Sequence, residues 1–149
     1  LGRVIVVTEP YASFPANMEG LDEFELGGVK GRVGPRREYL QVVGKKDALF
    51  GSMLTLDKAF ANLVSWQTAG LEGVWSGKRE PTPLDDALVN AARATATNPA
   101  RLVGLDRTRH TGVLAEGNRA DLVLAELKGD AGDYALEVRE TFVDGRRVS

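Results

Sequence analysis

Residues 4–7 read Val-Ile-Val-Val, a run of four β-branched apolar residues that leads into Thr8, Glu9 and Pro10. A short, continuous apolar run of this kind is typical of a strand with both faces buried, as in a parallel sheet. Parallel strands are joined by crossover connections, so such a strand needs neighbours. The run therefore predicts an interior parallel strand that ends in a carboxylate, within a fold that supplies its partners.

The remainder of the chain predicts two groups of antiparallel strands. Polar and apolar residues alternate on both sides of Gly27-Gly28, which is the signature of a hairpin, and Asp144-Gly145 is a second tight-turn dipeptide. We expect a loop at 47–53 (DALFGSM). The strands are expected at 23–26, 29–33, 38–43, 120–125 and 136–143.

Helices are predicted between the two groups of strands. The first begins at Thr55-Leu-Asp57 and carries an apolar stripe at helical spacing, made of Leu56, Phe60, Leu63 and Val64. The second begins at Thr82-Pro83, a strong start signal, and its buried face is expected to be Leu84, Leu88, Ala91 and Ala92. Asn98-Pro99 repeats that signal, and we interpret it as the cap of a short helix over 100–103.

Composition excludes several classes of site. The chain has no cysteine, so it cannot form disulfides, thiolate metal sites or cysteine nucleophiles. The net charge of -2 gives no electrostatic reason to expect nucleic acid or an anionic membrane as a partner. No apolar stretch approaches the roughly 18 residues of a membrane span. The one histidine, His110, lies between arginines in a loop-like stretch and is expected to be solvated.

Several motifs together resemble the C-terminal part of the N-acetylglucosamine-6-phosphate deacetylases, a family of the amidohydrolase superfamily. They are Val6-Val-Thr-Glu9, Glu25-Leu-Gly-Gly28, Leu49-Phe-Gly-Ser-Met-Leu-Thr-Leu56, Ala96-Thr-Asn-Pro-Ala-Arg-Leu-Val-Gly-Leu105, Gly112-Val-Leu-Ala-Glu-Gly-Asn-Arg-Ala-Asp-Leu-Val123 and Thr141-Phe-Val-Asp-Gly145. The pieces at 96–105 and 112–123 are typical of amidohydrolases in general, whereas those at 25–28 and 49–56 point to the deacetylase branch.

The resemblance implies an α/β plus β fold: the C-terminal fragment of a metal-dependent (β/α)₈ TIM-barrel hydrolase with most of its β-sandwich domain. Residues 1–20 would be the last barrel strand and the active-site loop, and 47–110 the loop and helices that pack on the barrel. Residues 21–46 and 111–149 would be sandwich strands. The other barrel strands, and further sandwich strands, would lie upstream of residue 1.

The resemblance assigns a catalytic role to Glu9, at the barrel face where such enzymes hold their chemistry. The family has Asp there, which acts on the metal-bound water and then protonates the leaving amine. Glu reaches one methylene further, and a shift of about 1 Å at a reacting centre can cost on the order of 100-fold in rate. Judged by the residues alone, an acid after a strand is more simply a solvated turn residue.

The substrate-binding residues implied by the resemblance are Leu49, Phe50 and Gly51. In the family this loop lines the sugar site, with backbone groups close to the substrate. Phe50 replaces a small residue and would narrow or reshape the pocket. The residues alone also fit a plain turn before a helix, in which Gly51 supplies backbone freedom.

The function implied is deacetylation of N-acetylglucosamine 6-phosphate to glucosamine 6-phosphate and acetate by a cytoplasmic enzyme. A divalent metal, zinc or similar, would be held by upstream residues, with none bound by this chain alone. The expected partner is the amino-sugar phosphate rather than nucleic acid or membrane, and a homodimer is compatible with the sequence. The alternative is a non-catalytic relative that serves as a sugar-binding or assembly module, which the departures at Glu9 and Phe50 favour.

Overall fold

The computed structural model describes residues 3–8, 22–34, 39–45, 48–73 and 76–149. The chain divides into two compact units. We call Val7–Leu56 the sheet unit, and Leu1–Val6 together with Asp57–Ser149 the helical unit.

The sheet unit contains a four-stranded antiparallel sheet in which each strand pairs with the next along the chain. Gly27 and Gly28 connect the first two strands with φ of 59° and 76°, the left-handed geometry of a two-residue hairpin turn. The hairpin predicted on both sides of these glycines is therefore confirmed. The strands are β1 (Glu23–Leu26), β2 (Val29–Val33), β3 (Tyr39–Val42) and β4 (Leu49–Ser52).

The strand β4 lies where the sequence predicted a loop, so that prediction is wrong. Its four residues include Gly51, which is a poor strand former, and they lack a clear alternation of polar and apolar side chains. Pairing with β3 decides the conformation instead: Gly51 lies opposite Leu40, whose side chain is almost fully buried. Tertiary pairing has outweighed the local pattern here.

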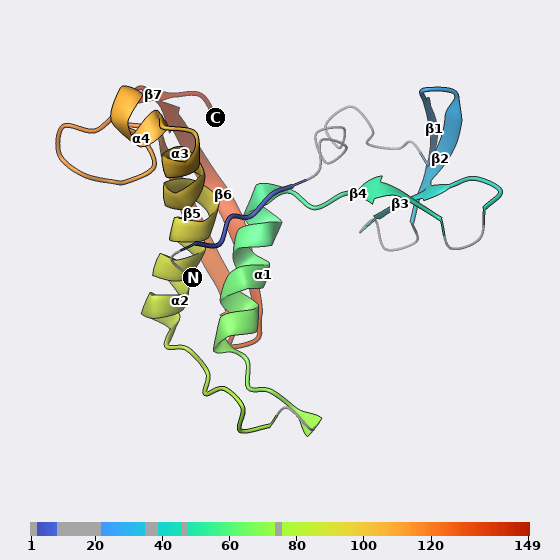
Figure 1. The fold of residues 1–149 in the computed structure, drawn as a ribbon, viewed down its shortest axis with the longest axis horizontal. Helices are drawn as coiled ribbons and strands as arrows, with labels where there is room; N and C mark the ends of the chain where they lie inside the picture. The colour runs from blue at the N-terminus through green and yellow to red at the C-terminus, as the bar shows by residue number, and fades with distance from the viewer. Residues whose placement is uncertain (1–2, 9–21, 35–38, 46–47, 74–75) are drawn as a thin grey trace. The chain divides into compact units, whose positions relative to one another are not determined.

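The helical unit contains several helices followed by a three-stranded antiparallel sheet, and Figure 1 shows the long hairpin of that sheet running along the helices. Its elements are α1 (Leu56–Thr68), α2 (Leu84–Ala92), the π-helical segment η4 (Arg93–Thr97), α3 (Asn98–Leu102), α4 (Leu105–Thr108), β5 (Leu122–Asp130), β6 (Asp133–Val143) and β7 (Arg146–Arg147).

The core of the helical unit lies where α1, α2 and the β5–β6 hairpin meet. Val64 of α1 is fully buried against Ala87 and Ala91 of α2, whose small side chains let the two helices approach closely. Partly buried residues surround this cluster: Phe60, Leu63, Leu88, Leu127 and Tyr134. The apolar stripe predicted for the first helix is thus found in the core, except that Leu56 is half exposed.

Buried hydroxyl groups on α1 hold the tip of the hairpin. The Tyr134 backbone N–H donates to Ser65 Oγ at 2.7 Å, and the Gly132 N–H donates to Thr68 Oγ1 at 3.2 Å. The Thr68 hydroxyl in turn donates to the Val64 carbonyl of its own helix at 2.9 Å. These contacts join segments about 65 residues apart in the chain. They form a polar face of α1, which the apolar periodicity of the sequence did not predict.

The apolar run at the start of the chain is not a buried strand. Residues 4–8 have no strand geometry, and Val7 is 82% exposed. Two backbone groups of the run are bonded to the helices instead: the Val6 N–H donates to the Ala94 carbonyl at 3.0 Å, and the Val4 carbonyl accepts from Asn98 Nδ2 at 2.7 Å. Apolar β-branched content cannot distinguish a buried strand from an extended segment bonded to a helix.

Pro99 explains why a carbonyl of that helix is available to accept a hydrogen bond from Val6. Proline has no N–H, and its ring clashes with the carbonyl four residues earlier, so a helix that continues through it must widen. The Asn98 N–H bonds to the Arg93 carbonyl, a π-type step, which leaves the Ala94 carbonyl for Val6. Asn98 is therefore not a helix cap: α2, η4 and α3 form one continuous run through Pro99.

The predicted fold class is wrong. Among the described residues there are two separate antiparallel sheets, and neither a barrel nor a parallel strand pair is present. The barrel was implied by the resemblance to the deacetylases, and residues 4–7, which were expected to be its last strand, do not form a strand. No helix formed by the described residues is both long enough and apolar enough to cross a membrane.

Candidate functional site

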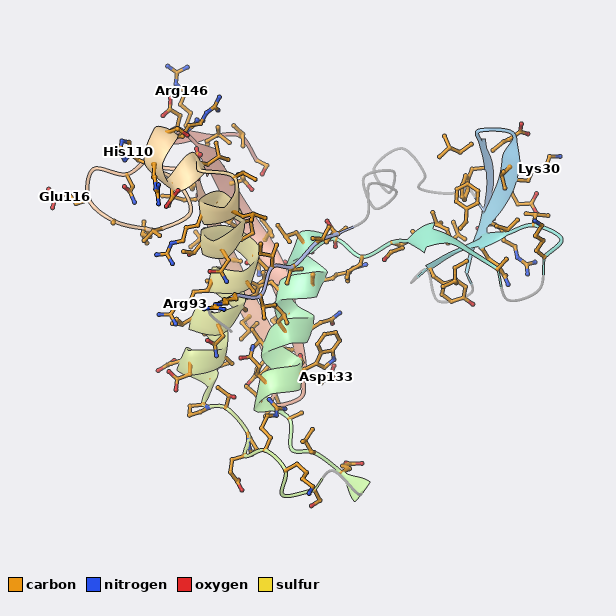
Figure 2. The ribbon with its side chains drawn as sticks, in the orientation of Figure 1. Lys30, Arg93, His110, Glu116, Asp133 and Arg146 are labelled. Carbon is orange, nitrogen blue, oxygen red and sulfur yellow. The ribbon has the colours of Figure 1, made fainter. Side chains whose placement is uncertain are left out.

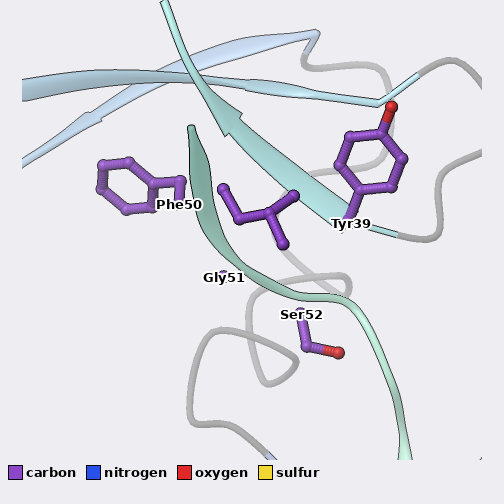
Figure 3. A pocket seen from close by; sticks show the side chains of 5 residues that line it. Tyr39, Phe50, Gly51 and Ser52 are labelled. Atoms are coloured by element: carbon purple, nitrogen blue, oxygen red, sulfur yellow. The ribbon is translucent and has the colours of Figure 1, made fainter. Parts of the chain in front are cut away.

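A pocket on the sheet unit is formed by two neighbouring strands. It has a volume of about 360 Å³ and is lined by Tyr39 of β3 and by all four residues of β4, Leu49, Phe50, Gly51 and Ser52. Figure 3 shows the Tyr39 and Phe50 rings on the two paired strands, with Gly51 and Ser52 following Phe50 along β4. The volume is at the lower end of the range for small-molecule sites, about 300–1,000 Å³.

An irregularity in strand pairing places Phe50 at this pocket. Gly51 pairs with Leu40 and Leu49 pairs with Gln41, so the register shifts between these pairs and Phe50 is the extra residue of β4. Such a bulge bends the strand and redirects the side chain of the extra residue. Phe50, one of the two residues that depart from the deacetylase pattern, thus lies at the bulge and lines the pocket.

Two glycines provide space for the aromatic side chains around the pocket. The ring of Phe24 lies over Gly31, where an added Cβ would come within 2.2 Å of the ring. Phe24 then meets the ring of Phe50 edge to face, with 5.1 Å between the centroids. Tyr39 lies over Gly34 in the same way, at 2.9 Å from an added Cβ. The rings of Phe24 and Tyr39 therefore pack directly on glycine backbone.

The lining offers apolar surface beside a few polar groups. The Phe50 and Tyr39 rings are half buried, whereas Leu49 is 70% exposed and lies at the open side. Ser52 Oγ accepts a hydrogen bond from the Leu54 N–H at 3.0 Å, which fixes its position. Aromatic faces next to hydroxyl groups suit a small ligand with one apolar face and a polar rim, such as a sugar ring.

The structure brings the three predicted substrate-binding residues together in this pocket. Leu49, Phe50 and Gly51 are neighbours on β4, but that they bind substrate stays a prediction. Glu9, the predicted catalytic residue, lies outside the described residues. Tyr39 was not predicted as a site residue from the sequence. Its ring lies over Gly34, five positions earlier, and no local pattern of residues indicates such a contact.

The described residues do not fit the divalent metal that the resemblance implies. Within 3–8, 22–34, 39–45, 48–73 and 76–149, no three His, Cys, Asp or Glu side chains gather where they could hold a metal ion. His110 is exposed, with φ of 51°, and its carbonyl accepts from the Arg119 N–H at 2.9 Å. We therefore derive no chemical step through a metal.

Comparisons with known proteins found no match to this chain among protein-family models, curated proteins or solved structures. The resemblance to the deacetylases accordingly rests on the quoted motifs alone.

Proposed function

We propose that this chain is part of a hydrolase that deacetylates N-acetylglucosamine 6-phosphate, and that the pocket on the sheet unit contributes to its sugar site. The observation that carries the proposal is the position of the deacetylase-like motif at 49–56: its first four residues form the strand that lines the pocket.

In this proposal the pocket binds the pyranose ring. Phe50 and Tyr39 provide aromatic surface for the apolar face of the sugar, and the backbone of Gly51, which carries no side chain, allows close approach of the ring hydroxyls. Glu9 accepts a proton from the attacking water and returns it to the leaving amine. The divalent metal is held by residues other than the described ones. The enzyme is cytoplasmic, and a homodimer is compatible with it.

Binding to this chain tests the role of the pocket. We expect N-acetylglucosamine 6-phosphate to shift the amide NMR resonances of residues 49–52 in a saturable way, and Phe50→Ala to weaken binding by about tenfold through loss of the aromatic wall. Val29→Ala is the matched control, because Val29 is an exposed apolar residue of the same sheet outside the lining. Equal losses in both variants, or no shift at 49–52, would show that this pocket does not bind the sugar.

Catalysis tests the role of Glu9. In the longest polypeptide of the native gene that contains these residues, Glu9→Gln should lower kcat by about 10²–10⁴ with little change in KM. Glu9→Asp restores the residue of the family but shortens the reach, so a faster variant would mean that Glu is a partial loss. Full activity of Glu9→Gln would remove Glu9 from the mechanism.

A non-catalytic sugar-binding role is the second candidate, and Phe50 favours it. Its ring stands at the bulge where the family has a small residue. In that case the 49–52 resonances would still respond to the sugar phosphate, while the native gene product would release no acetate from it.

A further inference from the structure

A second pocket lies in the helical unit, along the continuous helix that includes the π-helical segment. It has a volume of about 330 Å³ and is lined by Arg93, Thr97, Asn98, Arg101 and Val113. Figure 2 marks Arg93 on this helical run. None of these residues lines the sheet-unit pocket, and the inference below does not depend on the proposed function.

The π-helical segment aligns the two arginines. In a regular α-helix, residues eight apart are rotated by about 80° from each other. A π turn accommodates one extra residue, which reduces that rotation to about 20°. Arg93 opens η4 and Arg101 lies in α3, so the widening at Pro99 brings both onto one face. Widened turns of this kind are frequent at functional sites.

The walls of the pocket are fixed by hydrogen bonds on both sides of the helix. Thr97 Oγ1 donates to the Gly112 carbonyl at 2.7 Å and draws the loop with Val113 against the helix. Gly112 has φ of 90°, and a Cβ there would lie 2.6 Å from Ala100 Cβ, so a glycine is needed for this approach. On the other side, the buried Asn98 side chain donates to the Val4 carbonyl. The part of the pocket between the two arginines, formed by Thr97, Asn98 and the loop with Val113, is therefore held by hydrogen bonds.

This pocket carries the positive charge of two arginines. Within the part of the chain that the structure describes, Arg93 and Arg101 form no ion pair, and both side chains are exposed to solvent. Guanidinium groups bind oxyanions through paired N–H donors, and phosphate matches that geometry. Two guanidinium groups on one small pocket, without an ion pair to any described residue, favour a ligand that carries two negative charges.

We infer that this pocket binds a phosphate group, held between Arg93 and Arg101. The group is either inorganic phosphate or the phosphoryl end of a small phosphate ester, since both present the same dianionic oxygens. The pocket volume leaves room for a small ester but not for a large ligand.

The experiment titrates the chain with inorganic phosphate at constant ionic strength and follows the amide resonances of residues 93–101 and 112–113. We expect saturable shifts at these positions. Arg93→Gln and Arg101→Gln should each weaken binding by about 10- to 100-fold, because each removes charge-assisted hydrogen bonds. Both residues are exposed, so the variants are expected to fold, which circular dichroism checks.

Arg107→Gln is the matched control, since Arg107 is an exposed arginine of the neighbouring α4 that does not line the pocket. It should leave phosphate binding within about twofold of the parent. Arg93→Lys should retain part of the affinity, because it keeps the charge but loses the paired donors. Equal weakening by Arg107→Gln, or unchanged binding in the Arg93→Gln/Arg101→Gln double variant, would overturn the inference.

Comparing ligands identifies the source of the phosphate. Tighter binding of N-acetylglucosamine 6-phosphate than of inorganic phosphate at 93–101 would identify a phosphate ester as the ligand. Equal binding would identify the free anion. If N-acetylglucosamine without phosphate shifted the same resonances as strongly, the pocket would not be a phosphate site.

Discussion

The two antiparallel sheets formed by the described residues have similar topology but are stabilised by different interactions. In the sheet unit, aromatic rings lie over glycine backbone, as Phe24 does over Gly31, and the ring contacts continue to the candidate pocket. In the helical unit, the β5–β6 hairpin packs one face on α1 and carries an ion-pair ladder on exposed positions. A sheet with a helix behind it can leave its other face to charged residues. In the sheet unit, glycines leave room for aromatic rings at particular positions, and the pocket lies beside these rings.

The largest expected effect is on the helix-backed side of this comparison. Val64→Asp places a carboxylate in the fully buried centre of the helical core, and we expect the free energy of unfolding to fall by more than about 4 kcal/mol. Urea unfolding followed by circular dichroism measures this. Val89→Asp on α2 is the control, because Val89 is 48% exposed. Similar losses in the two variants would mean that Val64 is not at the core.

Gly31→Ala tests the packing of aromatic rings on glycine in the sheet unit. The new methyl group would overlap the Phe24 ring, so the ring must move and lose its edge-to-face contact with Phe50. We expect a loss of about 1–3 kcal/mol in unfolding free energy, together with altered ring-current shifts at Phe50. Gly70→Ala is the matched control, since nothing lies within 4 Å of its added Cβ. An unchanged Phe50 spectrum in Gly31→Ala would contradict the proposed seating of the rings.

Ser65→Ala tests how the hairpin is attached to α1. It leaves the Tyr134 N–H without its partner, and a buried unsatisfied donor costs about 1–3 kcal/mol. We expect faster amide hydrogen exchange at the β5–β6 tip than in the parent. Ser76→Ala, at an exposed position, should change neither exchange nor stability. A protected tip in Ser65→Ala would show that apolar packing alone holds the hairpin.

The smallest expected effect comes from the ion-pair ladder. A hydrogen bond from Arg139, followed by the charge of Lys128, lowers the pKa of Glu126 below its ordinary value of 4.5, and a hydrogen bond from Lys128 does the same for the pKa of Glu137. Glu126 in turn raises the pKa of Arg139. Glu126 of β5 lies directly opposite Glu137 of β6, and the ion pairs Lys128–Glu137 and Arg139–Glu126 run diagonally across the two strands.

The sign of the pH effect follows from the lowered carboxyl pKa values. The stabilisation is fully present above the unfolded-state pKa near 4.5 and is lost as the pH falls through the lower folded-state values. Because the groups are exposed, the change should be small and should shrink in high salt. Thermal unfolding between about pH 7 and pH 3 measures it. A Glu126→Gln/Glu137→Gln variant with the same pH dependence as the parent would remove the ladder as its cause.

Local patterns succeeded where a segment carries its own constraint. Gly27-Gly28 can adopt left-handed geometry with no steric cost, so the first hairpin could be predicted from two residues. The stripe of α1 was likewise readable, because helical spacing is a property of the segment itself. The motif at 49–56 predicted a site at Leu49, Phe50 and Gly51, which line the sheet-unit pocket, but it did not predict their strand geometry.

Patterns failed where a backbone group is satisfied by a distant partner. Residues 4–7 look like an interior strand, yet their hydrogen bonds go to carbonyl and amide groups of the helix that Pro99 widens. Asn98 looks like a cap and instead bonds to residue 4. Composition and residue spacing do not predict such a hydrogen bond between segments about 90 residues apart.

The sequence by itself therefore determined the turns, the main helices and the residue types that can do chemistry, because these depend on intrinsic backbone freedom and on local periodicity. Only the tertiary structure decided which strand lines the sheet-unit pocket, where Phe50 bulges from β4, and that Arg93 and Arg101 share a face. Each of these depends on pairing or widening that satisfies backbone groups across the chain, and such satisfaction is settled only when the distant segments meet.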